Sequence, residues 1–217
     1  FSKKYASVED GVTSTSAPLA VKDKIIVGSA GGDSGMRGFI AALSAETGEE
    51  IWRVYTVPAK GEPGSETWGD LIQWGGGAAW LSGTYDPELN TLYWTTGNPW
   101  PDFNASVRPG DNLYTCSLLA LDLDTGKMKW YFQFTPHDTH DWDAQSWPML
   151  IDMEWEGRPR KVVLHANRNG FFYVLDRETG EFLRATQLTD SVNWASGIGK
   201  DGRPILMPDK DPTLEGN

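Results

Sequence analysis

The stretch Leu119-Ala-Leu-Asp-Leu-Asp-Thr-Gly-Lys-Met-Lys-Trp130 returns twice in this chain of 217 residues. One copy is Ala41-Ala-Leu-Ser-Ala-Glu-Thr-Gly-Glu-Glu-Ile-Trp52, and the other is Tyr173-Val-Leu-Asp-Arg-Glu-Thr-Gly-Glu-Phe-Leu-Arg184. Each reads as a strand, a turn at Thr-Gly and a second strand, with the Gly supplying the positive φ of the hairpin. We expect the Trp that ends the first two copies to pack between neighbouring sheets; Arg184 breaks this position in the third.

Short strand signals fill the chain between the repeats. Apolar runs cover Leu19 to Gly28 and Val162 to His165, and a turn at Tyr85 to Asn90 leads into a strand at Thr91 to Thr96. No amphipathic helix of ten or more residues is convincing, and 11 Trp with 24 Gly favour strands joined by tight turns. The sequence therefore predicts an all-β fold in which residues 1–217 form part of a β-propeller, about three to four blades. A β-sandwich is the weaker alternative, because sandwiches do not usually repeat a hairpin of this length.

Composition excludes several classes of partner. The net charge of −11 argues against nucleic acid and anionic membranes, and no apolar run is long enough for a transmembrane helix. Cys116 is the single cysteine, so no disulfide can form within this segment. Since the chain starts at Phe1 without a signal sequence, we expect it to be a piece of a longer protein.

An acidic stretch, Pro136-His-Asp-Thr-His-Asp-Trp-Asp143, is the main candidate for chemistry. Carboxylates this close together repel one another unless a cation or a proton donor lies among them. On an extended strand Asp141 and Asp143 would point to the same face. They could then bind a hard cation, such as calcium with oxygens at about 2.3–2.6 Å. The alternative is a solvated acidic loop without a ligand.

Six motifs follow one another along the chain: Gly28–Phe39, Trp74–Trp80, Thr96–Pro99, Arg108–Asn112, Pro136–Asp143 and Asn167–Gly170. Together with the Thr-Gly repeat they resemble the pyrroloquinoline quinone (PQQ)-dependent alcohol dehydrogenases, which are eight-bladed propellers with tryptophan-docked blades. The ending Val192–Gly197 is most similar to the ethanol-oxidising and quinohaemoprotein branch. The resemblance implies a periplasmic oxidoreductase that converts primary or other small alcohols to aldehydes and passes electrons to cytochrome c or a similar acceptor.

The resemblance also implies a metal site. Asn98 matches a family Asn that ligates calcium, and Asp33 falls where the family has a Glu that is one methylene longer. Asp141 matches the catalytic Asp, which ligates the metal and takes the hydroxyl proton of the alcohol. Asp143 matches an additional Asp of the lanthanide-using relatives, whose trivalent ion needs more negative charge. We therefore expect one metal ion, lanthanide(III) or Ca²⁺, with Asp143 favouring the lanthanide.

The remaining expected contacts are to PQQ itself. Trp80 resembles the Trp that stacks on the flat ring, and Thr15 matches a Thr that binds a cofactor carboxylate. Arg168 matches a cation at the quinone oxygens, where it would stabilise the reduced cofactor. Three neighbouring residues match the backbone segment near the ring: Ala30, Gly31 and Gly32. Other parts of the family's cofactor pocket have no counterpart here, so we do not expect this chain to be active alone.

Two other classes of function compete with the dehydrogenase. A non-catalytic propeller scaffold would keep the Thr-Gly hairpins but has no reason to keep Asn98, Asp141, Asp143 and Arg168 together. A propeller hydrolase could use Asp141 and Asp143 as acid and base, although their spacing says little about the separation of the carboxylates.

Overall fold

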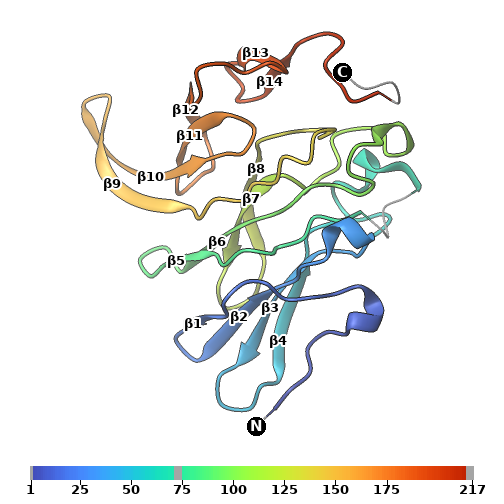
Figure 1. Cartoon of the computed structure of the whole chain (residues 1–217). Coiled ribbons are helices and arrows are strands. Elements are labelled where there is room, and N and C mark those ends of the chain that lie inside the picture. The colour runs from blue at the N-terminus through green and yellow to red at the C-terminus, as the bar shows by residue number, and fades with distance from the viewer. Residues whose placement is uncertain (1, 71–74, 214–217) are drawn as a thin grey trace.

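Three four-stranded antiparallel sheets make up most of the computed structural model, which describes residues 2–70 and 75–213 (Figure 1). The first sheet contains β1 (Leu19–Val21), β2 (Lys24–Gly28), β3 (Phe39–Ser44) and β4 (Glu50–Tyr55). The second contains β5 (Thr84–Asp86), β6 (Thr91–Thr95), β7 (Ser117–Asp122) and β8 (Met128–Gln133). The third contains β9 (Met149–Trp155), β10 (Arg158–Ala166), β11 (Phe171–Asp176) and β12 (Phe182–Gln187). A two-stranded sheet of β13 (Ala195–Ile198) and β14 (Pro204–Leu206) follows.

Each copy of the repeat forms the hairpin between the third and fourth strands of a sheet. The turn glycines have positive φ as predicted, 73° at Gly48, 70° at Gly126 and 77° at Gly180. The pairing register of each hairpin shifts at the same point of the repeat: between Ala42 and Leu43, between Ala120 and Leu121, and between Val174 and Leu175. Equivalent sequence thus gives equivalent geometry, which confirms the prediction of repeated hairpin units.

Tryptophan joins successive sheets. The indole of Trp52 lies against Gly126 of the next hairpin, where an added Cβ would come within 2.7 Å of the ring, and its Nε1–H donates to the Leu123 carbonyl at 2.9 Å. Trp130 lies against Gly180 in the same way. The predicted packing of these Trp residues between neighbouring sheets is confirmed. Arg184, at the third position, instead lies over the ring of Trp155.

The middle sheet supplies side chains to two apolar cores. Leu92 and Trp94 of β6 pack toward the first sheet, whereas Tyr93 between them packs toward the third. β7 behaves alike, with Leu119 in the first core and Leu118 in the second. Because alternate residues of a strand point to opposite faces, one hydrophobic strand serves both neighbours, and the sheets stack face to face as propeller blades do.

Several expected strand boundaries differ from the structure. The run Leu19 to Gly28 is a hairpin, because Lys22 adopts a left-handed turn with φ of 53°. Val162 to His165 is the centre of the longer β10, and Tyr85 already belongs to β5. Helices in the described residues are four three-residue 3₁₀ turns: η1 (Val8–Asp10), η2 (Gly32–Ser34), η3 (Ser65–Thr67) and η5 (Ala105–Val107). None of them could cross a membrane.

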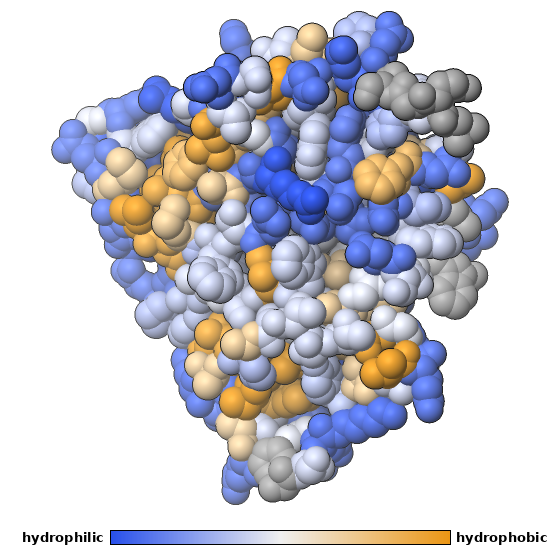
Figure 2. Space-filling model, viewed as in Figure 1, coloured by the Kyte–Doolittle hydropathy of each residue, from blue (hydrophilic) through white to orange (hydrophobic). Residues whose placement is uncertain are grey.

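One face of the third sheet carries an exposed apolar row. Met149, Ile151 and Met153 alternate along β9 and are 48%, 39% and 39% exposed. Leu150, which points the other way, packs against the second core. Figure 2 shows an apolar patch on the side of the molecule where β9 lies in Figure 1.

Candidate active site

All ten residues predicted to bind cofactor or metal surround one cavity of about 440 Å³. Its lining comprises Thr13, Thr15, Ala30, Gly31, Gly32, Asp33, Ala78, Trp80, Asn98, Asp141, Asp143 and Arg168. Trp74, which opens one of the motifs, lies outside the described residues.

The topology explains this convergence. In a sequential antiparallel sheet the loop after the second strand and the connection after the fourth strand leave from the same end. The cavity-lining residues come from the segment before β1 and from such connections, at residues 29–38, 56–83, 96–116, 134–148 and 167–170. The Thr-Gly hairpins lie at the opposite end, so the repeat builds the scaffold and the other motifs build the cavity.

Asp141 and Asp143 share the guanidinium of Arg168. Its Nη2 lies 3.3 Å from Asp141 Oδ2, and its Nη1 lies 3.6 Å from Asp143 Oδ2. The expectation that an extended strand aligns the two carboxylates is wrong, because residues 138–147 form a loop and Asp141 has a φ of 60°. They nevertheless line one cavity, since the left-handed turn at Asp141 redirects the chain between them.

Asp143 is the most buried of the predicted ligands that carry a charge. Its Oδ1 accepts the backbone N–H of Asn98 at 2.6 Å. This approach requires glycine at position 97, where an added Cβ would lie 2.5 Å from the same oxygen. Burial and, to a smaller extent, the negative charge of Asp141 raise the pKa of Asp143 to about 7, against the effects of the Asn98 N–H and Arg168. A carboxylate in this state is stabilised as the anion by a nearby cation.

The amide of Asn98 is oriented by a carboxylate that the sequence analysis did not identify. Its Nδ2 donates to Asp102 Oδ1 at 2.7 Å and to the Pro99 carbonyl at 3.2 Å. Its Oδ1 consequently faces Gly32, 3.7 Å from the position of an added Cβ there. Burial, together with the charges of Asp33 and Asp141, raises the pKa of Asp102 to about 6, against the effects of Asn98 and Arg108. Several negative charges therefore act on one another around this cavity.

The donor set fits a hard cation. Asp33 on η2, the Asn98 amide oxygen, Asp141 and Asp143 all line the cavity, and carboxylate and amide oxygens suit calcium and similar ions. Within residues 2–70 and 75–213, however, no three His, Cys, Asp or Glu side chains form a compact metal-binding group. Arg168 pairs with Asp141 and Asp143 through different nitrogens and offsets part of their negative charge.

Several of the predicted cofactor contacts are joined to one another and to their neighbours by hydrogen bonds and close packing. Thr15 Oγ1 donates to the Trp80 carbonyl at 2.8 Å, which ties the segment before β1 to the loop that carries the indole. Ala30 exchanges two backbone hydrogen bonds with Thr13, and Gly32 approaches Ala78 closely. The half-buried Trp80 offers a flat apolar surface for a ring, and these residues fit a planar cofactor.

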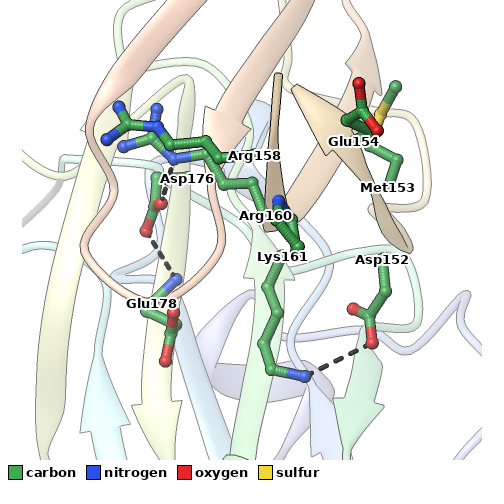
Figure 3. Close-up of a pocket in the computed structure, with 9 residues that line it drawn as sticks. Asp152, Met153, Glu154, Arg158, Arg160, Lys161, Asp176 and Glu178 are labelled. Carbon is green, nitrogen blue, oxygen red and sulfur yellow. Dashed lines mark hydrogen bonds and ion pairs between the residues drawn. The ribbon is translucent and has the colours of Figure 1, made fainter. Parts of the chain in front are cut away.

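A second cavity, of about 650 Å³, lies along β9 and β10 and was not predicted (Figure 3). Several of its lining charges are paired with neighbouring side chains. Arg160 Nε lies 2.8 Å from Asp176, and Lys161 Nζ lies 3.3 Å from Asp152. Such pairs neutralise one another at the surface of a blade, so we assign the chemistry to the first cavity.

Comparisons with known proteins point to one family. Residues 2–188 match the family described as PQQ, glucose/ethanol/alcohol dehydrogenase, β-propeller domain. The quinohemoprotein alcohol dehydrogenase of Comamonas testosteroni is 46% identical over 93% of this chain and 30% of its own length. The lanthanide-dependent methanol dehydrogenase of Methylacidiphilum fumariolicum is 39% identical over 95% of this chain and 37% of its own length. The solved structure of a europium-containing methanol dehydrogenase superposes with a TM-score of 0.91 at 38% identity, covering 97% of this chain and 40% of that one.

Proposed function

Because this chain belongs to the PQQ-dependent glucose, ethanol and alcohol dehydrogenase family of β-propellers, we propose that the full-length protein oxidises primary or other small alcohols to aldehydes. The chain spans about a third of the length of the curated relatives that it matches. The proposal therefore concerns the protein to which these 217 residues contribute part of the site.

One observation carries the proposal. Ten residues that were identified through separate motifs, between Thr15 and Arg168, line a single cavity. A non-catalytic scaffold needs the Thr-Gly hairpins at the other end of the sheets but has no use for this convergence. The cavity also combines a flat aromatic wall with an acidic wall, as a planar cofactor beside a cation requires.

We assign the proton-transfer role to Asp141. It is the half-exposed carboxylate of the pair, with a side chain 29% exposed against 10% for Asp143, so an alcohol could reach it from the cavity. Burial raises the pKa of Asp141, and Arg168 opposes this rise. Arg168 thereby keeps Asp141 ionised and able to accept the hydroxyl proton of the alcohol.

Asp33, Asn98, Asp141 and Asp143 would hold the metal ion, and Thr15, Ala30, Gly31, Gly32, Trp80 and Arg168 would hold PQQ. When bound, PQQ supplies the acceptor for the hydride of the alcohol carbon, and the metal ion supplies a Lewis acid. Within the cavity Trp80 orients the ring, Arg168 provides positive charge beside it, and Asp141 takes the proton.

We further propose that the metal is a lanthanide rather than calcium. Asp143 adds a third carboxylate to the site, and its buried charge is better balanced by a trivalent ion. Asp33 partly offsets this argument, because its side chain is one methylene shorter than the family's Glu. Relatives that are named lanthanide-dependent are among the matched proteins.

The family resemblance also implies a periplasmic location and cytochrome c or a similar protein as electron acceptor. The acceptor also follows from the proposed chemistry, because a two-electron oxidation needs an acceptor that regenerates the cofactor.

Reconstitution tests the proposal directly. The full-length apoprotein would be supplied with PQQ and either Ca²⁺ or La³⁺, and dye reduction with short alcohols would be followed. We expect activity with both groups present and a higher rate with La³⁺. Inactivity with both metals would overturn the dehydrogenase assignment, and activity with Ca²⁺ alone would overturn the lanthanide assignment.

A further inference from the structure

Asp138 is a buried carboxylate at the start of the loop that carries Asp141. The residue is only 1% exposed, and it does not line the cavity. Oδ1 accepts the backbone N–H of His140 at 3.0 Å, and Oδ2 accepts the backbone N–H of Trp142 at 2.8 Å. These two N–H groups belong to the residues on either side of Asp141, so one carboxylate brackets the proposed base.

The two hydrogen bonds of Asp138, called the Asp138 bracket below, can stabilise a strained backbone, because Asp141 adopts a conformation that its Cβ disfavours. Its φ of 60° lies in the left-handed region, which residues other than glycine enter only when surrounding contacts hold them there. Among the described residues, the side chain of Asp141 pairs with Arg168, itself 40% exposed. The rings of His140 and Trp142 stack on each other with centroids 4.2 Å apart, and the backbone N–H groups of the same two residues are held by the buried Asp138 carboxylate.

Arg108 joins this bracket to the other half of the site. Arg108 is fully buried, and its guanidinium donates to the carbonyl of Asp138 and, at 2.8 Å, to that of Asp102. It also donates to the side chain of Asn112 at 2.7 Å. Asp102 in turn accepts from the amide of Asn98. A single buried cation thus ties the Asn98 loop to the Asp141 loop, which uses the otherwise unassigned Arg108–Asn112 motif.

We propose that Asp138 is a positioning residue that holds Asp141 in its left-handed conformation, with the carboxylate directed into the cavity. This inference rests on the proposed function, in which Asp141 accepts the proton. Without the bracket, the backbone of residues 140–142 would relax toward ordinary dihedral angles. The Asp141 carboxylate would then move away from Arg168 and from the other metal donors.

The variant Asp138→Asn tests the inference in the full-length protein. The amide oxygen can accept one of the two N–H groups, but the amide nitrogen then faces the other donor. Asp122→Asn is the matched control, since Asp122 accepts backbone N–H groups of Asp124 and Thr125 in a hairpin at the opposite end of the sheets. The measurements are kcat per PQQ-containing site, KM, and the affinity of the apoprotein for Tb³⁺ by sensitised luminescence.

We expect Asp138→Asn to lower both kcat per site and Tb³⁺ affinity by about 10–100-fold, as outer residues that orient ligands do. Asp122→Asn should change neither. Asp138→Ser is the second variant in case the Asn variant does not fold, because its single hydroxyl oxygen can still accept one of the two N–H groups and its own O–H can rotate away from the other; an intermediate loss is expected.

The outcomes separate the two proposals. If the wild type oxidises alcohols and either folded Asp138 variant keeps the wild-type kcat per site and Tb³⁺ affinity, the positioning role is overturned while the proposed function stands. If the wild type binds Tb³⁺ but oxidises no alcohol with any metal, the proposed function is overturned and this inference with it. Loss of stability with unchanged kcat and affinity per folded molecule would assign Asp138 a purely structural role.

Discussion

At the scale of single residues, Asp143 is the cavity carboxylate whose charge is most strongly affected by its surroundings. Its carboxylate is buried and faces both Arg168 and Asp141, and its other oxygen is fixed by the Asn98 N–H. Removing a carboxylate in this position removes negative charge from the site without removing the proposed base. The residue can therefore separate metal binding from proton transfer.

We expect Asp143→Ala in the full-length protein to lower the rate of lanthanide-dependent alcohol oxidation by about 100-fold or more. The reason is that loss of the metal ion removes a Lewis acid that contributes several kcal/mol to catalysis. The far-UV circular dichroism spectrum should stay unchanged. Asp190→Ala, at an exposed carboxylate, is the control and should keep full activity. An Asp143→Ala enzyme as active as the wild type with La³⁺ would show that this carboxylate does not select the ion.

His165 offers a pH-dependent test away from the cavity. It is fully buried, stacks on Phe134 with ring centroids 4.4 Å apart, and its Nδ1 has no hydrogen-bond partner among the described residues. Burial lowers the pKa of His165 to about 3, whereas a histidine in an unfolded chain has a pKa of about 6.5. Between these two values only the unfolded state binds the proton, so stability is lost as the pH falls.

We therefore expect the free energy of unfolding to fall by up to about 1.4 kcal/mol for each pH unit below about 6.5 from this group alone. His165→Gln removes the titration and keeps a hydrogen-bond acceptor for Asn167. Urea unfolding at pH 7, 6 and 5 should give a shallower pH dependence for this variant than for the wild type. Equal slopes in the two proteins would refute the prediction.

The sequence could predict the cavity residues but not what supports them. Asp33, Asn98, Asp141 and Arg168 stand in motifs whose spacing is visible in the chain. Asp138 and Asp102 are ordinary acidic residues there, and their importance comes from burial and from backbone contacts that form only on folding. The left-handed φ of Asp141 was equally hidden, because Asp gives no local signal for this conformation comparable to that of glycine.

At the scale of elements, the hairpins were predictable and their connections were not. A Thr-Gly turn fixes its geometry within a few residues, so the copies around Gly48, Gly126 and Gly180 could be recognised without tertiary information. The strand boundaries at Lys22 and Tyr85 depend on pairing with neighbouring strands, which local sequence does not determine. Trp52 and Trp130 marked the contacts between sheets, because a large ring requires a surface to pack on.

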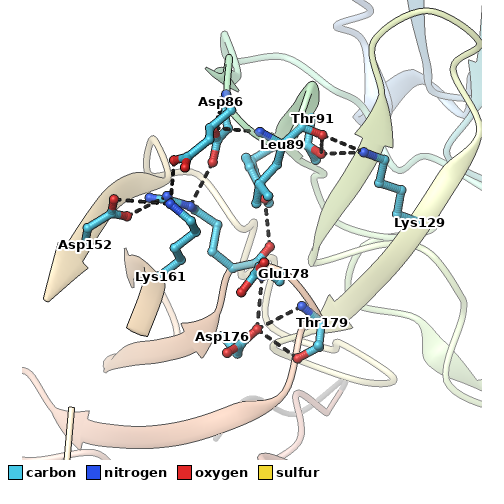
Figure 4. A network of polar contacts seen from close by, with 12 residues as sticks. Asp86, Leu89, Thr91, Lys129, Asp152, Lys161, Asp176, Glu178 and Thr179 are labelled. Atoms are coloured by element: carbon cyan, nitrogen blue, oxygen red, sulfur yellow. Dashed lines mark hydrogen bonds and ion pairs between the residues drawn. The ribbon is translucent and has the colours of Figure 1, made fainter. Parts of the chain in front are cut away.

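A buried ion pair also connects two sheets. Arg177, after β11, directs Nε to Asp86 Oδ2 at 2.9 Å, and both side chains are nearly inaccessible, 6% and 4% exposed. The pair is close but lacks good hydrogen-bond alignment at these two atoms. Arg177 Nη2 also donates to Asp152 at 2.6 Å. Figure 4 shows Asp86, on β5, and Asp152, on β9, within this network between the second and third sheets.

We expect Arg177→Met to destabilise the protein by about 3–5 kcal/mol, because it leaves the buried Asp86 carboxylate without a counter-ion. The double variant Arg177→Met with Asp86→Asn removes both charges and should recover a large part of the loss. Arg203→Met, at a pair with Asp111 whose side chains are 51% and 37% exposed, should cost less than about 1 kcal/mol. Denaturant unfolding measures all three, and similar losses for Arg177→Met and Arg203→Met would contradict the expected dependence on burial.

At the scale of the whole molecule, the exposed apolar row on β9 and the net charge oppose each other. In a propeller each blade packs against the next, so a blade face is normally covered on both sides. Here Met149, Ile151 and Met153 remain exposed together, which favours association of the chain with itself. The net charge of −11 favours separate molecules. Contiguous apolar surface on a sheet face usually prevails over a diffuse charge at physiological salt, since exposed charges are screened within about 8 Å.

The 217-residue chain alone should therefore self-associate and bind the dye ANS, and the row on β9 should be the cause. The double variant Met149→Lys/Ile151→Lys places two charges in the row and should lower ANS fluorescence several-fold and shift light scattering toward the monomer mass. Val8→Lys/Ile51→Lys is the control, since these side chains are 78% and 45% exposed outside the row. Both double variants change the net charge equally, so an equal effect of the two would show that charge alone controls association. A monomeric wild type without ANS binding would show that the row does not drive association.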